Sequence, residues 1–224
     1  MPREDYQERL DGLRKDVVGM SDLVLERLDK GMEALETKDE DLAWEVIDGD
    51  DEVNELYLEI EQECVDLIAL QQPVAGDLRL IAASFKIITD LERIADLATN
   101  LGEYTLDARR TYFSEVDVQE VGEFASEMVN DAVAAYENED IEACYGIDDR
   151  DERLDRRCED ASERIMRDLI RGIDIETDEE MELLLGETSR LLLTIRDLER
   201  VGDHAVNIAA RTLYMLENDD ELIW

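Results

Sequence analysis

Pairs of carboxylates four residues apart follow an apolar helical stripe at several places in this chain. Ile81, Phe85 and Ile88 lead at helical spacing to Glu92, and Asp96 follows one turn later at the margin of the stripe. At 100° per residue these side chains share one face of a helix. The spacing predicts that this acid pair points towards the core side of its helix.

Three further segments repeat the arrangement. Acids occupy 62 of 224 positions, so an isolated acid pair carries no information, and the evidence is the position on an apolar stripe. The pairs are Glu199 with Asp203 after Leu185, Thr188, Leu192 and Ile195; Asp51 with Glu55 after Trp44 and Ile47, with Leu58 and Val65 beyond; and Asp151 with Asp155 after Ile141 and Cys144.

Carboxylates gathered on a core-side face must be neutralised. Raised pKa values, arginine partners and bound cations are the usual compensations. Clustered oxygen ligands suit iron, manganese, magnesium or calcium, and zinc is compatible. In the alternative interpretation the pairs lie on the bundle margin and bridge to Arg93, Arg200 or solvent. The pattern alone leaves both open.

The elements that carry these pairs are helices. The chain has two prolines, long stretches repeat apolar residues every three or four positions, and no segment alternates as a strand does. Thr177 with Glu180 forms a capping-box pattern before the last helix. The sequence predicts an all-α fold of six helices, over 4–36, 39–71, 74–109, 114–137, 139–171 and 178–217.

An internal duplication organises these helices into two halves. Residues 90–100 match residues 197–207, 107 positions later, with seven of eleven identical. The segment that holds Ile47, Asp48, Asp51 and Glu55 matches one that begins at Ile147, 100 positions later. Two tandem three-helix bundles related by a pseudo-twofold axis are therefore predicted, with a boundary near Tyr112 and domains over 1–112 and 113–224.

The charge balance restricts the function. Twenty-three Lys and Arg face 62 Asp and Glu, a net charge of −39, and only four of the basic residues are lysines, which is typical of a halophile's protein. An acidic surface that mimics nucleic acid or binds a basic partner is the alternative. Binding to nucleic acid is not expected, because no basic stripe is visible. The chain has neither an apolar signal core nor a membrane-length apolar run, which favours the cytoplasm.

The remaining reactive side chains give no catalytic pattern. Cys64, Cys144 and Cys158 lack CxxC spacing, and the last two lie at core-facing positions, so we interpret them as small buried residues. A ferritin-like di-iron site needs Glu-x-x-His on two helices, whereas the chain has one histidine, His204. An enzyme is therefore not expected.

The repeated segments identify a family. Leu91-Glu92-Arg93-Ile94-Ala95-Asp96, the segment from Leu198 to Ala209 and the Gln71-Gln72-Pro73-Val74-Ala75-Gly76-Asp77-Leu78-Arg79 turn resemble the PhoU family over nearly the whole chain. The resemblance implies two three-helix bundles with pseudo-twofold symmetry. It also implies iron or zinc clusters, bound in some members through acid-x-x-x-Asp motifs. The matching positions are Asp51, Glu55, Glu92, Asp96, Asp151, Asp155, Glu199 and Asp203.

The resemblance also implies a function. PhoU proteins restrain high-affinity phosphate uptake through the ATPase subunit of the phosphate ABC transporter, and many signal through a membrane sensor kinase. The alternatives are a metal-carboxylate enzyme and a purely structural acidic helical adaptor. A homodimer is compatible with the sequence, which does not determine the oligomeric state.

Overall fold

The computed structural model describes residues 3–71, 73–108, 116–172, 175, 177–217 and 222, without the side chains of residues 3, 4, 70 and 71. Every regular element within these residues is an α-helix, as the sequence predicts. The helices are α1 (Arg3–Thr37), α2 (Glu40–Asp48), α3 (Asp50–Gln71), α4 (Ala75–Leu106), α5 (Val118–Asn138), α6 (Ile141–Arg171) and α7 (Asp178–Glu217).

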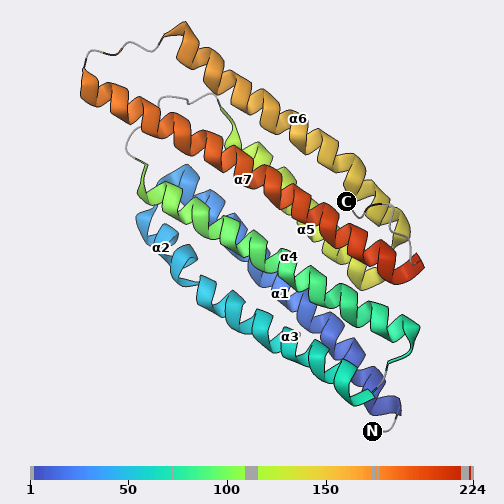
Figure 1. Cartoon of the computed structure of the whole chain (residues 1–224). Coiled ribbons are helices and arrows are strands. Elements are labelled where there is room, and N and C mark those ends of the chain that lie inside the picture. The colour runs from blue at the N-terminus through green and yellow to red at the C-terminus, as the bar shows by residue number, and fades with distance from the viewer. Residues whose placement is uncertain are drawn as a thin grey trace.

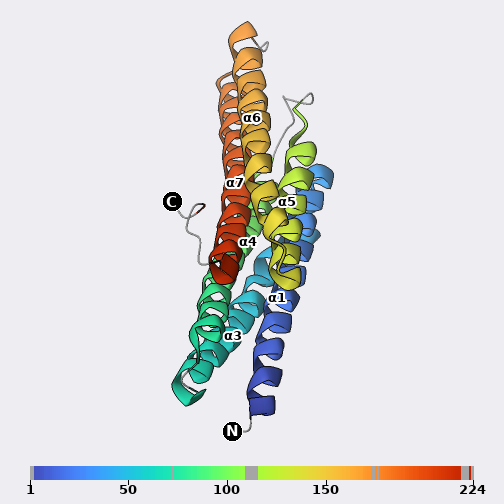
Figure 2. The same ribbon diagram turned by 90° about the vertical axis from the view of Figure 1, so that its right-hand side faces the viewer.

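The helices form two bundles that lie side by side. The first bundle packs α1, α2, α3 and α4 together, and the second packs α5, α6 and α7. All the long helices run along the same direction of an elongated molecule (Figure 1), and the view from the side shows the two bundles in lengthwise contact (Figure 2). The turn between α3 and α4 lies at one end of the molecule, and the ends of α6 and α7 that are joined lie at the other.

The predicted helix over 39–71 is interrupted at Gly49. The α2 helix ends at Asp48 and α3 begins at Asp50. A Cβ added at Gly49 would lie 1.4 Å from a terminal nitrogen of Arg27, so the guanidinium fills the space beside this glycine. Arg27 is buried and pairs with Glu52 at 2.6 Å. The first bundle therefore divides its second helix in two, whereas α6 is continuous.

Other predicted boundaries shift by a few residues. The third helix ends at Leu106 rather than at 109, and the fourth begins at Val118 rather than at 114. The predicted domain boundary at Tyr112 lies outside the described residues. Thr177 caps α7 as expected, because its hydroxyl accepts a hydrogen bond from the Glu180 N–H at 3.1 Å.

Buried positions define the register of the duplication. Between α2–α3 and α6 the equivalent residues are 101 apart, not 100 as predicted, so the predicted register is wrong by one residue. The consequence is that Asp50 corresponds to Asp151 and Asn54 to Asp155. The buried pairs are Ala43 with Cys144, Val46 with Ile147, Val53 with Leu154, Ile60 with Ala161 and Cys64 with Ile165.

The turns before these helices agree with a spacing of 101. Lys38 and Glu139 both adopt left-handed backbone, with φ of 57° and 56°. The next residues, Asp39 and Asp140, cap their helices through side-chain carboxylates. Between α4 and α7 the predicted spacing of 107 is confirmed, since Ile88 and Ile195 are both buried, as are Leu91 and Leu198, Ala98 and Ala205, and Leu101 and Ile208.

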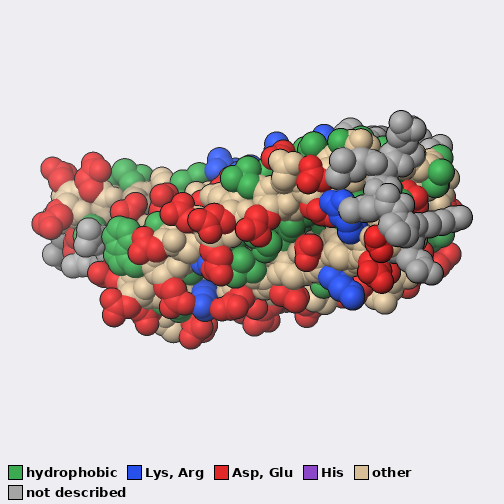
Figure 3. All heavy atoms as spheres, turned by 90° about the horizontal axis from the view of Figure 1, so that it is seen from below, with side chains coloured by type: hydrophobic (Ala, Val, Ile, Leu, Met, Phe, Trp, Pro, Cys, Tyr) green, Lys and Arg blue, Asp and Glu red, His purple; other side chains and the backbone are tan. Residues whose placement is uncertain are grey.

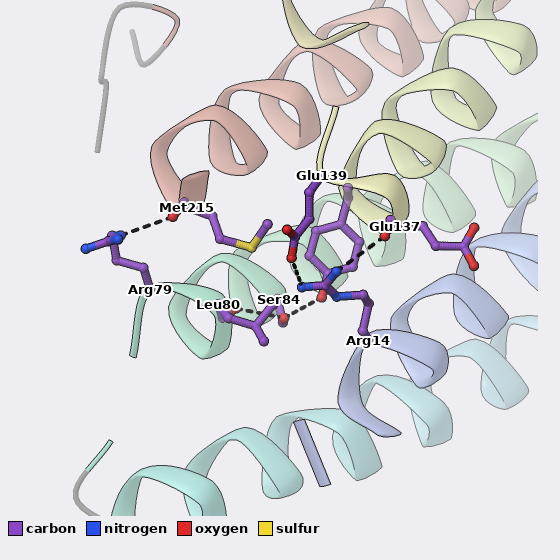
Figure 4. Close-up of polar contacts among 8 residues, drawn as sticks. Arg14, Arg79, Leu80, Ser84, Glu137, Glu139 and Met215 are labelled. Atoms are coloured by element: carbon purple, nitrogen blue, oxygen red, sulfur yellow. Dashed lines mark hydrogen bonds and ion pairs between the residues drawn. The ribbon is translucent and has the colours of Figure 1, made fainter. Parts of the chain in front are cut away.

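The two bundles contact each other through α4 with α7 and through α1 with α5. At one end of this junction Arg14 of α1 donates to the Glu137 carbonyl at 3.3 Å and to the Glu139 carboxylate at 2.6 Å. Nearby, Arg79 of α4 donates to the Met215 carbonyl at 3.1 Å (Figure 4). These hydrogen bonds connect the first bundle to the end of α5, to the turn after it and to the last residues of α7.

All three cysteines are buried and unpaired, which confirms the packing role predicted for Cys144 and Cys158. Within the part of the chain that the structure describes, no helix is both long and apolar enough to cross a membrane.

Candidate functional site

The second bundle brings four predicted acids together. Asp151 and Asp155 come from α6, and Glu199 and Asp203 come from α7. Burial raises the pKa of Asp151 to about 7, and the charges of the other three carboxylates add to this effect. Burial also raises the pKa values of Glu199 and Asp203, and in both cases the charge of Asp155 is the next cause. Four acids thus repel one another at the margin between α6 and α7.

Gly202 makes room for this cluster. A Cβ at Gly202 would lie 2.3 Å from Leu154 Cδ2 and 3.2 Å from Asp151 Oδ1. Leu154 is fully buried, so the glycine lets α6 approach α7 closely at the level of Asp151. Asp151 Oδ1 is itself buried and has no hydrogen-bond partner among the described residues. A proton or a cation on this oxygen would compensate for its burial.

The first bundle assembles a related but different cluster. Burial raises the pKa of Glu92, and the charges of Asp96 and then Asp50 raise it further. Burial likewise raises the pKa of Asp96, and Asp50 is its next cause. Asn54 donates a hydrogen bond to Asp50 at 2.8 Å. An amide therefore stands where the second bundle has the Asp155 carboxylate.

The predicted core orientation of Asp51 and Glu55 is wrong. Both are exposed, as are residues of their apolar stripe: Trp44 is 52% exposed, Leu58 58% and Val65 48%. The physical reason is that another face of α2 and α3 meets the core, the one that carries Ala43, Val46, Val53, Ile60 and Cys64 on both sides of Gly49. On this side of α3 it is Asp50, not Asp51, whose charge raises the pKa of Glu92.

The clusters lie at the surface margin of each bundle. Asp96, Asp155 and Asp203 are exposed, whereas Glu92, Asp151 and Glu199 are half-buried. The apolar stripe predicted on α7 is not buried at its first residue, because Leu185 is 47% exposed. Among the described residues no group of three or more His, Cys, Asp or Glu side chains has the geometry of a metal site. The donor set suits a hard cation, and metal binding by the eight predicted residues stays a prediction.

A second set of polar residues, which the sequence analysis did not assign, joins the two bundles. Asp90 of α4 accepts a hydrogen bond from Asn207 of α7 at 3.3 Å and lies 2.8 Å from His204 Nδ1. Asp197 of α7 accepts hydrogen bonds from Asn100 at 3.1 Å and from the Tyr104 hydroxyl at 2.8 Å, both of α4.

These contacts repeat one pattern in both directions. Asp90 and Asp197 are the first residues of the duplicated segments, and Asn100 and Asn207 are the last. Each bundle thus offers its Asp to the Asn of the other. The signal was present in the sequence, because both identities face away from the apolar stripe. His204 is buried against Asp90, which gives it a structural contact between the bundles.

The fold and the site define a class of protein: a duplicated three-helix bundle with a carboxylate cluster on each half. A family model described as "PhoU domain" matches residues 17–105 and again residues 118–212. The two matches begin 101 residues apart and end 107 residues apart, as the two registers require. The chain belongs to the PhoU family.

Individual relatives agree with this assignment. The chain is 30% identical over 97% of its length to a phosphate-specific transport system accessory protein PhoU homolog of Pseudomonas putida, 82% of which is covered. It is 33% identical over 94% of its length to PhoU homolog 1 of Thermotoga maritima, with 88% of that protein covered.

A solved structure shares the fold. The crystal structure of the phosphate transport system regulatory protein PhoU from Streptococcus pneumoniae superposes with a TM-score of 0.86 at 25% identity, covering 96% of this chain and 98% of that one. The PhoU structure from Pseudomonas aeruginosa gives a TM-score of 0.83 at 28% identity, covering 96% and 100%.

Proposed function

We propose that this protein is a cytoplasmic accessory regulator that restrains phosphate uptake by direct contact with the ATPase subunit of a phosphate ABC transporter. The observation that carries the proposal is the match of both halves to one family, whose relatives are named as accessory proteins of phosphate-specific transport and align along nearly the whole chain. In this proposal the protein acts by binding and catalyses no reaction.

The carboxylate clusters have a supporting part in this proposal. They hold iron, zinc or another divalent cation in one or both bundles, and the cation draws the second and third helices of a bundle together. The raised pKa of Asp151 and its unpartnered buried oxygen support this part, because both mark a carboxylate that needs a positive partner. A metal would set the shape of the surface offered to the transporter.

The proposal is tested in cells that lack this protein. Deletion should raise phosphate uptake at high external phosphate, and the wild-type chain supplied on a plasmid should restore the restraint. The purified chain should also bind the ATPase subunit in molar KCl, measured by analytical ultracentrifugation. Either unchanged uptake after deletion or no binding of the ATPase subunit would reject the proposal.

A further inference from the structure

Each bundle exposes apolar side chains at the end where its second and third helices meet. In the first bundle Val65, Val74 and Leu78 are 48%, 69% and 43% exposed. We call these three residues the first hairpin end. In the second bundle Met166, Met181 and Leu185 are 43%, 44% and 47% exposed, and they form the second hairpin end.

The two hairpin ends are equivalent in the duplication. Val65 and Met166 are 101 residues apart, which is the spacing of α3 and α6. Leu78 and Leu185 are 107 residues apart, which is the spacing of α4 and α7. Val74 and Met181 lie beside them, Val74 as the extended N-cap of α4 and Met181 within α7. Two exposed positions have therefore stayed apolar in both halves of the protein.

Other exposed apolar residues have not been kept in this way. Leu58 is 58% exposed, and its equivalent is Glu159. Leu193 is 37% exposed, and its equivalent is Lys86. Exposed positions in this acidic chain thus change freely between the halves. Retention of apolar side chains at both hairpin ends indicates that something covers them.

The charged residues around the hairpin ends indicate the chemistry of a partner surface that could bind there. Asp178, Glu179 and Glu182 are exposed beside Met181 and Leu185. Two neighbouring arginines are already paired, Arg167 with Glu163 at 2.7 Å and Arg171 with Asp168 at 3.7 Å. Asp66 and Asp77 are half-buried beside the first end. Acidic side chains also spread over the face in Figure 3, and the net charge is −39. A fitting surface is apolar at its centre and carries Lys or Arg at its rim.

The positions of the two hairpin ends indicate how many copies of a partner one chain can bind. The two ends lie at opposite ends of the elongated molecule (Figure 1), so one small surface cannot cover both. Equivalent positions in a duplicated fold present the same chemistry twice. We infer that the two hairpin ends are equivalent docking surfaces and that one chain binds two copies of a single partner surface, apolar with a basic rim. Building on the proposed function, we place that surface on the transporter's ATPase subunit.

The test measures stoichiometry with the full chain and the purified ATPase subunit in molar KCl, by native mass spectrometry and light scattering. Wild type should bind two copies. Val74→Ser with Leu78→Ser, and separately Met181→Ser with Leu185→Ser, should each leave one copy. All four substitutions together should weaken binding at least tenfold. All these side chains are exposed, so circular dichroism and melting temperature should stay at wild-type values. The control is Leu58→Ser with Leu193→Ser, which alters exposed apolar residues that the duplication has not kept and should still bind two copies.

The outcomes separate the two proposals. Binding that survives the fourfold variant overturns the docking surfaces and leaves the proposed function intact. Binding of a single copy by wild type, lost in one paired variant only, overturns the equivalence of the two ends. Failure of wild type to bind the ATPase subunit at all overturns both proposals.

Discussion

Asp197 accepts a hydrogen bond from Asn100 of the other bundle at 3.1 Å, and Asp90 returns the same contact with Asn207 at 3.3 Å. Asp197 is fully buried and Asp90 nearly so. Buried carboxylates need partners, and these exchanged bonds supply them across the contact between the bundles, in addition to Arg196 and Arg200 of α7, which lie 3.2 Å and 3.7 Å from Asp197.

We predict that Tyr104→Phe destabilises the protein by about 1.5–3 kcal/mol, because it removes a hydrogen bond to the buried Asp197 carboxylate at 2.8 Å. The free energy of unfolding from urea titration in molar KCl measures the loss. The matched control is Tyr57→Phe, whose hydroxyl lies 3.5 Å from Glu61 and which should change stability by less than about 0.5 kcal/mol. Equal effects in the two variants would contradict this assignment.

We predict that stability falls as pH rises from about 4 towards 7. Asp151 has its pKa raised to about 7 from 3.8, so between these values the folded state binds more protons than the unfolded state. One unit of difference between the folded-state and unfolded-state pKa corresponds to about 1.4 kcal/mol. Asp151→Asn imitates the protonated acid and should flatten this dependence, with its largest gain above pH 7.

Unfolding midpoints at pH 5, 6, 7 and 8, with EDTA present, check the dependence. Glu152→Gln is the control, since Glu152 is an exposed neighbour paired with Arg156 at 2.7 Å, and its profile should follow wild type. A parallel profile for Asp151→Asn would show that Asp151 does not titrate in this range.

We predict that metal content depends on Asp50 and not on Asp51. Glu92→Ala with Asp96→Ala should remove metal from the first bundle only, and Glu199→Ala with Asp203→Ala from the second only. Asp50→Ala should act like the first double variant, because Asp50 is the acid whose charge reaches Glu92 and Asp96. Asp51→Ala is the matched control, one residue away and exposed.

Elemental analysis and thermal shift in molar KCl measure these effects, with EDTA compared against added iron, zinc, manganese, magnesium and calcium. If wild type binds no metal above background, the prediction of metal binding is wrong, and solvent and bound protons alone compensate the carboxylates. If Asp51→Ala removes metal and Asp50→Ala does not, the register of 101 is wrong for this site.

We predict that helical circular dichroism weakens on dialysis from molar KCl to about 0.1 M. The Debye length grows from about 3 Å to about 10 Å over that change, so the repulsion expected of a net charge of −39 is no longer screened. An identical melting curve in both buffers would exclude a halophilic adaptation.

The helices and the duplication were predictable because both leave long periodic signals. The α4–α7 register followed from seven identities in eleven residues. The α2–α6 register did not, since the resemblance of Asp51 and Glu55 to Asp151 and Asp155 at a spacing of 100 was coincidental. The burial pattern of Val46, Val53 and Ile60 against Ile147, Leu154 and Ala161 gives 101.

The need for glycine at position 49 could not be predicted from the sequence, because it arises from tertiary packing. A Cβ there would occupy the space that the Arg27 guanidinium from α1 fills. The spacing of Trp44, Leu58 and Val65 predicted that these side chains are buried. Spacing reports only that side chains share a face of a helix. Which of two apolar faces meets the core is decided by the neighbouring helices.

The exchanged Asp–Asn contact also bears on the ancestry of the fold. Two separate copies of a single three-helix unit, facing each other across a twofold axis, would make this contact twice, as an isologous dimer does. Joining the copies into one chain removes the need for both halves to stay identical. Tyr104 now supports Asp197, while His204 supports Asp90 from a position whose counterpart is Leu97. The two halves of one chain can thus differ at equivalent positions, which two identical subunits of a symmetric dimer cannot.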